Sequence, residues 1–132
     1  MRDNGYEPRW DISRAIGAPA EQWVKDIRSA LEHGSIEVKR DRLAMKTGNL
    51  YVEYECLRMG QFRPSGIRTT KADAWVFVLV EDSFGLILKT DYLRGLCDSP
   101  GVKTREETDG SHPTRGYLLP LRWMVAPYKV QS

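Results

Sequence analysis

Two runs of alternating polar and apolar residues, between Ile36 and Cys56, constrain the fold of this chain more than any other stretch. The first run, IEVKRD, begins at Ile36, and the second, LYVEYE, begins at Leu50. In both runs apolar residues recur at every second position, which is the period of a strand with one buried face. The connection MKTGN contains Gly48 and Asn49, two residues that favour tight turns. We therefore predict two strands joined by a polar turn.

The opposite faces of these two strands are rich in acidic residues. If the strands pair antiparallel, four carboxylates and a lysine gather on one side of the hairpin: Glu37, Lys39, Asp41, Glu53 and Glu55. Like charges destabilise a sheet, and close carboxylates resist ionising together. A divalent cation removes this conflict, because Mg²⁺ prefers hard oxygen ligands. The alternative is a solvated polar face on which Lys39 and Arg40 neutralise the acids.

The whole chain has the composition of one globular domain. It has 132 residues, of which 41% are hydrophobic and 29% charged. The net charge of +2 predicts no overall basic field, although local basic clusters could follow a phosphate backbone. Cys56 and Cys97 are isolated, so neither a zinc site nor a disulfide framework is indicated. No apolar run has the length of a membrane span, and the charged start MRDNGYEPRW differs from a signal peptide. These features predict a cytoplasmic protein without a membrane partner.

Helix and strand signals alternate along the chain. We predict an irregular N-terminal arm at residues 1–17 and a single domain at residues 18–132. Pro19 is expected to open a helix that Gly34 ends. After the two strands described above, the expected elements are a short helix at residues 71–73, strands at 75–80 and 86–89, a helix at 91–97, and strands at 102–106 and 117–121. This order predicts an α/β (α+β) fold in which a mixed β-sheet is flanked by helices.

Several short motifs coincide with a known pattern. Glu21 falls on the leading helix, Asp41 closes one strand, and Glu53 with Glu55 falls on the next. The segments SGIRTTKADAWVF (residues 65–77) and PTRG (residues 113–116) follow. With these motifs the chain, from residue 19 to residue 121, resembles the PD-(D/E)XK nuclease superfamily. It is most similar to the small phage and archaeal Holliday-junction-resolvase-like members. The resemblance implies a restriction-endonuclease-like core.

The resemblance also implies a metal site. Asp41 and Glu53 would bind Mg²⁺ or Mn²⁺ together with the carbonyl group of residue 54, and Glu21 would complete the set of ligands. Glu53 opens the E-x-K signature of the superfamily, but Glu55 stands at the lysine position. Either Lys39 or Glu55 would then orient or deprotonate the attacking water.

A second register of the signature reads Glu37-Val38-Lys39 as E-x-K. No aspartate lies on a strand just upstream to complete this version, so Asp41 with Glu53 is the preferred pair.

Partners follow from the same resemblance. Hydroxyl and basic side chains around the acidic strands are candidates for contact with DNA phosphates: Ser65, Arg68, Thr69, Lys71 and Arg115. DNA, either branched or duplex, is the expected partner. A homodimer is expected as well, because two strands cut symmetrically require two sites.

The leading functional hypothesis is therefore a Mg²⁺-dependent endodeoxyribonuclease that is selective for branched DNA. One alternative is a catalytically inactive DNA-binding or protein-interaction module that kept the fold after losing the signature lysine. The presence of all four acids favours the enzyme: Glu21, Asp41, Glu53 and Glu55. A nicking or repair nuclease with another DNA structure as its substrate is the third possibility.

Overall fold

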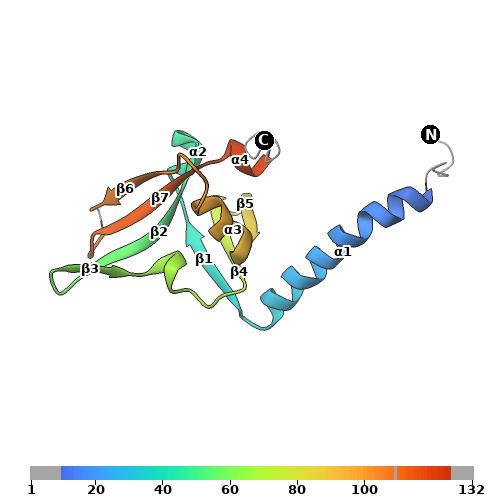
Figure 1. Ribbon diagram of the computed structural model, residues 1–132, viewed down its shortest axis with the longest axis horizontal. Helices are drawn as coiled ribbons and strands as arrows, with labels where there is room; N and C mark the ends of the chain where they lie inside the picture. The colour runs from blue at the N-terminus through green and yellow to red at the C-terminus, as the bar shows by residue number, and fades with distance from the viewer. Residues whose placement is uncertain (1–9, 109, 126–132) are drawn as a thin grey trace. The chain divides into compact units, whose positions relative to one another are not determined.

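The computed structural model describes residues 10–108 and 110–125. The chain forms two compact units, Met1–Gly34 and Ser35–Ser132. In the first unit, helix α1 (Trp10–Glu32) is a single helix of 23 residues (Figure 1). The prediction that the helix opens at Pro19 is wrong, because Pro19 lies inside α1. A proline within a helix removes one backbone hydrogen bond, yet here the helix continues on both sides of it. The expected irregular arm is therefore helical from Trp10, and residues 1–9 lie outside the described residues.

In the second unit, the described residues form two β-sheets and four short helical segments (Figure 1). The first sheet has the strand order β1 (Ile36–Arg40), β4 (Ala74–Val80) and β5 (Phe84–Lys89). The second sheet has the order β3 (Gln61–Pro64), β2 (Asn49–Arg58), β7 (Thr114–Pro120) and β6 (Lys103–Glu107). The helical segments are α2 (Ala44–Thr47), the 3₁₀ turn η1 (Gly66–Arg68), α3 (Thr90–Cys97) and α4 (Arg122–Val125).

The predicted fold class is confirmed. Strand β1 runs parallel to β4, whereas β5 runs antiparallel to β4, so the first sheet is mixed. The second sheet is antiparallel throughout. Helical segments flank the strands, as expected of an α+β fold. The closer likeness to a restriction-endonuclease core stays a prediction.

The predicted hairpin between the two acidic strands is wrong. Strand β1 pairs with β4, and β2 pairs with β3 and β7, so the two strands belong to different sheets. The residues between them do not form a tight turn; they form the one-turn helix α2, which Gly48 caps with a left-handed φ of 80°. Alternation predicts that a segment is a strand, but it does not say which strand is its neighbour.

The segment after β2 also differs from the expectation. Residues 61–64, where no element was predicted, form strand β3, and η1 follows directly after Ser65. The short helix predicted at residues 71–73 does not form. The hydroxyl of Thr70 instead accepts a local hydrogen bond from the amide of Ala72 at 3.2 Å.

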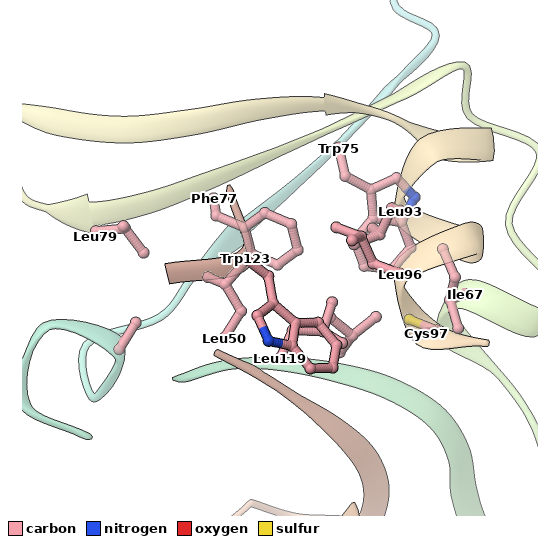
Figure 2. Packing of buried hydrophobic residues seen from close by; sticks show 12 residues of the cluster. Leu50, Ile67, Trp75, Phe77, Leu79, Leu93, Leu96, Cys97, Leu119 and Trp123 are labelled. Carbon is pink, nitrogen blue, oxygen red and sulfur yellow. The ribbon is translucent and has the colours of Figure 1, made fainter. Parts of the chain in front are cut away.

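The hydrophobic core joins the two sheets and helix α3 (Figure 2). Its fully buried side chains come from β4 (Trp75 and Phe77), from β2 (Leu50 and Val52), from α3 (Leu93) and from β7 (Leu119). Burying a large apolar side chain contributes about 1.5–3 kcal/mol. The core therefore packs β4 against β2, and β1 is attached to this core through its pairing with β4.

Candidate active site

An open pocket of about 560 Å³ lies where the end of β1 approaches β2 and β6. Its lining contains four basic and three acidic side chains, together with Leu43, Tyr51 and Trp75. The charged residues are Lys39, Arg40, Asp41, Arg42, Glu53, Arg105 and Glu107. Three of the predicted catalytic residues, Lys39, Asp41 and Glu53, thus meet in one pocket.

Asp41 connects the two sheets. Its backbone amide donates to the carbonyl oxygen of Val78 at 3.0 Å, which continues the pairing of β1 with β4. Its carboxylate accepts hydrogen bonds from the backbone amides of Ala44 at 3.1 Å and Tyr51 at 2.9 Å, one on each oxygen. A carboxylate has about four acceptor positions, so both oxygens keep the capacity to bind a further group. The carboxylate of Asp41 is therefore held in one orientation at the edge of the pocket.

Glu53 is held by the Ser65-Gly66 pair. The hydroxyl of Ser65 donates to Oε2 of Glu53 at 2.7 Å. Gly66 has a left-handed φ of 54°, and a Cβ at this position would overlap the backbone carbonyl group of Glu53. Only glycine allows this close approach without strain. Ser65, predicted to contact DNA phosphate, therefore uses its hydroxyl to orient an acid of the pocket.

The carbonyl group of residue 54 was the third expected metal ligand. In the structure the carbonyl oxygen of Tyr54 accepts a hydrogen bond from the amide of Ser65 at 3.0 Å. A carbonyl oxygen has two lone pairs, so this bond uses one of them.

Lys39 brings an ammonium group to the same pocket. Its Nζ lies 3.4 Å from a carboxylate oxygen of Glu37 and 5.6 Å from the centre of the Trp75 ring. The side chain is 38% exposed, so the ammonium group is in contact with solvent. Glu37 and Lys39, the acid and the base of the second register, are thus neighbours on β1.

Glu55 lies outside the pocket lining and faces two arginines. Its Oε2 accepts from Nη1 of Arg68 at 3.1 Å, and its Oε1 accepts from Nη1 of Arg115 at 3.2 Å. The side chain of Glu55 is only 20% exposed. Partly buried carboxylates require such compensation, so the acid at the lysine position acts first as the partner of two cations.

The remaining predicted DNA contacts divide into two groups. Arg68 and Arg115 are held by Glu55 and also lie over aromatic rings, Arg68 at 4.4 Å from the Tyr54 centroid and Arg115 at 3.7 Å from that of Phe62. Thr69 and Lys71 are exposed. The arginines of this set are therefore ordered by their neighbours, whereas Thr69 and Lys71 face solvent.

Glu21 belongs to the first unit. It is an exposed residue of α1, and the pocket belongs to the second unit. Its role as a metal ligand stays a prediction.

The donor set suits a hard cation. Mg²⁺ is commonly held by one or two carboxylates, with water and phosphate oxygens completing its octahedron. Asp41 and Glu53 supply two oriented carboxylates in the pocket. Within the described ranges, no group of three or more His, Cys, Asp or Glu residues is arranged to hold a metal ion. A cation in this pocket would therefore have two carboxylates, those of Asp41 and Glu53, as ligands from the described residues.

Seven pocket residues were not among the predicted site residues: Arg40, Arg42, Leu43, Tyr51, Trp75, Arg105 and Glu107. Tyr51 precedes Glu53 by two positions, so its place on the same face of β2 could have been read from alternation. The pKa of Tyr51 is raised, chiefly because burial disfavours the phenolate. Arg105 and Glu107 come from β6, and no local signal connects β6 with Asp41.

No known protein family, curated protein or solved structure matches this chain. None of the helices in the described residues combines the length and the apolar character needed to cross a bilayer. The functional interpretation therefore depends on the geometry of the pocket.

Proposed function

We propose that this protein is a metal-dependent endodeoxyribonuclease that hydrolyses phosphodiester bonds in branched DNA such as Holliday junctions. The observation that carries the proposal is the meeting of Asp41, Glu53 and Lys39 around one open pocket. The two acids come from different sheets, and hydrogen bonds hold each of them in place. We place the activity in the cytoplasm, or in the host cytoplasm if a phage encodes the chain.

Each of these residues has a chemical task in the proposal. Asp41 and Glu53 bind Mg²⁺ (Mn²⁺ can replace it), with Glu21 as a further proposed ligand. When bound, the cation lowers the pKa of a coordinated water and offsets charge on the phosphoryl oxygens. Hydrogen bonds from backbone amides keep Asp41 in position before substrate arrives, so little reorganisation is needed during the reaction.

Lys39 takes the role of the signature lysine. Its ammonium group lies in the pocket, whereas the carboxylate of Glu55 is bound by Arg68 and Arg115. A lysine ammonium is a compact donor that can orient a water or neutralise a phosphate oxygen. Glu55 then contributes by holding two arginines beside the site. Arg68 and Arg115, with Thr69 and Lys71, form the proposed surface for the DNA backbone.

A second candidate function is a catalytically inactive DNA-binding or protein-interaction module on the same fold. The ion pairs of Glu55 favour this alternative, because they occupy the residue at the lysine position with a structural task.

Cleavage of labelled DNA separates the two functions. Four-way junction, flap and linear duplex are incubated with the protein in Mg²⁺ or in EDTA, beside Asp41→Asn and Glu53→Gln. Two variants are needed because an Asn at position 41 cannot accept from both backbone amides. Asp91→Asn is the matched control, since the side chain of Asp91 is 98% exposed and pairs with Arg94 at 3.5 Å, outside the pocket.

We expect metal-dependent cleavage, highest for the junction, that both pocket variants abolish and the control retains. Binding of the junction without cleavage would replace the nuclease with the inactive module. Sedimentation of the protein–junction complex tests the proposed homodimer, for which we expect two protomers on one junction.

A further inference from the structure

A row of three residues crosses the second sheet beside the pocket. In the register of β2 with β7, Glu53 is opposite Gly116, and in the register of β7 with β6, Gly116 is opposite Arg105. Residues opposite each other on neighbouring strands share a face of the sheet. Neighbouring strands are separated by about 4.8 Å, so the backbones of Glu53 and Arg105 are roughly 10 Å apart. The middle residue of the row has no side chain.

The Tyr51 ring fills the space above Gly116. A Cβ at Gly116 would overlap ring atoms of Tyr51, so the ring lies directly against the glycine backbone. The hydroxyl groups of Tyr51 and Thr114 are joined by a hydrogen bond of 2.7 Å. Tyr51 is therefore fixed by its backbone on β2 and by its hydroxyl on β7.

Arg105 lies over this fixed ring. Its guanidinium carbon is 5.1 Å from the centre of the Tyr51 ring, and its Nη2 donates to Oε2 of Glu107 at 3.2 Å. The side chain is 37% exposed and lines the same pocket as Asp41 and Glu53. A guanidinium held by a ring and a carboxylate loses less conformational entropy when it binds a ligand than a free arginine does.

The geometry suits an anionic oxygen ligand. A guanidinium carries five N–H donors on three nitrogens, and the hydrogen bond to Glu107 uses one of these nitrogens, Nη2. Two parallel N–H groups match two oxygens of a phosphate. With their backbones roughly 10 Å apart, Glu53 and Arg105 can face the same stretch of a DNA backbone.

We propose that Arg105, positioned by Tyr51, Thr114, Gly116 and Glu107, binds a backbone phosphate close to the bond that is cut. This inference rests on the proposed function, and it extends the binding site from the metal ligands to the β6 edge of the sheet. The contact forms with the substrate in its ground state and does not require the metal.

The test compares Arg105→Ala with Arg28→Ala as a control. Arg28 is 77% exposed, pairs with Glu32 on α1 and is not part of this pocket. Fluorescence anisotropy gives the Kd for junction DNA in EDTA at several salt concentrations, and steady-state cleavage in Mg²⁺ gives kcat and KM.

In Arg105→Ala we expect Kd and KM to rise about tenfold, with kcat within about twofold of the wild type. The slope of log K against log salt should fall in magnitude by about 0.9, the value for one phosphate contact. Arg105→Lys should restore the salt slope but only part of the affinity, because an ammonium group cannot present two parallel N–H donors to a phosphate.

An unchanged Kd and salt slope in Arg105→Ala would overturn the phosphate site, and so would a loss confined to kcat. A wild-type protein that binds the junction without cutting it would overturn the nuclease but would leave the binding test of Arg105 readable. A wild-type protein that binds no DNA would overturn both proposals.

Discussion

The hydroxyl of Ser65 donates a hydrogen bond of 2.7 Å to Oε2 of Glu53. The two residues lie on different elements, Glu53 on β2 and Ser65 just before η1. A carboxylate with one oxygen held in this way presents its other oxygen in a restricted direction. The contact therefore connects the start of the segment at residues 65–77 with the proposed metal site.

Removing this hydroxyl should weaken metal binding. Removing a residue that hydrogen-bonds to a metal-binding side chain typically lowers the metal affinity by about 10–100-fold. In Ser65→Ala we expect the Kd for Mn²⁺, measured by isothermal titration calorimetry, to rise at least about tenfold. Ser99→Ala is the control, because the Ser99 hydroxyl donates to a helix carbonyl at 3.2 Å, away from the pocket. Equal affinities in the two variants would show that Glu53 needs no such support.

Adding a methyl group at Gly66 should destabilise the fold. In Gly66→Ala the new Cβ overlaps the Glu53 carbonyl group, and φ stays at 54°. We expect a loss of about 3 kcal/mol in the free energy of unfolding, measured with urea. Gly101→Ala separates the two causes, because its φ is 82° and nothing lies within 4 Å of the added Cβ. That control should lose only about 1 kcal/mol, and equal losses would contradict the overlap.

Placing a lysine at the signature position should lower the stability of the protein. Glu55→Lys would place a third cation between Arg68 and Arg115, which now contact the carboxylate. We expect a loss of about 2 kcal/mol in stability and no gain in cleavage. Glu81→Lys reverses the charge in a surface pair with Arg40 and should cost less than about 1 kcal/mol. A stable Glu55→Lys protein with higher activity would return the catalytic role to position 55.

An asparagine at the tip of the β2–β3 hairpin should stabilise the chain. Met59 is 94% exposed and has a φ of 50°, a left-handed conformation that side chains other than Asn and Asp rarely adopt. We expect Met59→Asn to raise the free energy of unfolding by about 0.5–1 kcal/mol, measured by thermal denaturation. Met45→Asn, at a 54% exposed position in helix α2, should give no gain. A loss of stability in Met59→Asn would contradict the backbone explanation.

The Cys97 thiol should resist modification. Burial raises its pKa to about 12, from an ordinary value of 9.0. Because only the thiolate reacts, Cys97 in a Cys56→Ser background should react with a disulfide reagent far more slowly in the native state than in urea. The unfolded chain loses this proton at lower pH than the native chain does, so the contribution to stability is present below pH 9 and falls as the pH rises towards 12. Equal native and unfolded rates would contradict the burial.

Strands were predictable from the sequence, but their partners were not. The alternation in residues 36–40 and 50–56 correctly indicated β1 and β2. The pairing of β2 with β7 joins Asn49 to Pro120, across most of the second unit, and no local pattern specifies such a neighbour. The expected turn formed helix α2 because Gly48 served as a helix cap.

For the candidate site, the sequence predicted some of the residues but not their neighbours in space. Asp41, Glu53 and Lys39 were identified as a group and do line one pocket. The environment of Glu55 depended on arginines 13 and 60 positions away, so its ion pairs could not be anticipated. Arg105 looked like one of many surface cations until the register of β6 and β7 placed it opposite Gly116.

The double attachment of Asp41 has a consequence for the order of folding. Its backbone amide donates to the carbonyl oxygen of Val78 in the first sheet, and its carboxylate accepts from the amide of Tyr51 in the second. Strand pairings between distant segments form slowly, because the loop between them must close first. In a chain in which only one sheet has formed, Asp41 and Glu53 are not yet brought together. The proposed site around Asp41 and Glu53 is therefore complete only after both sheets have formed.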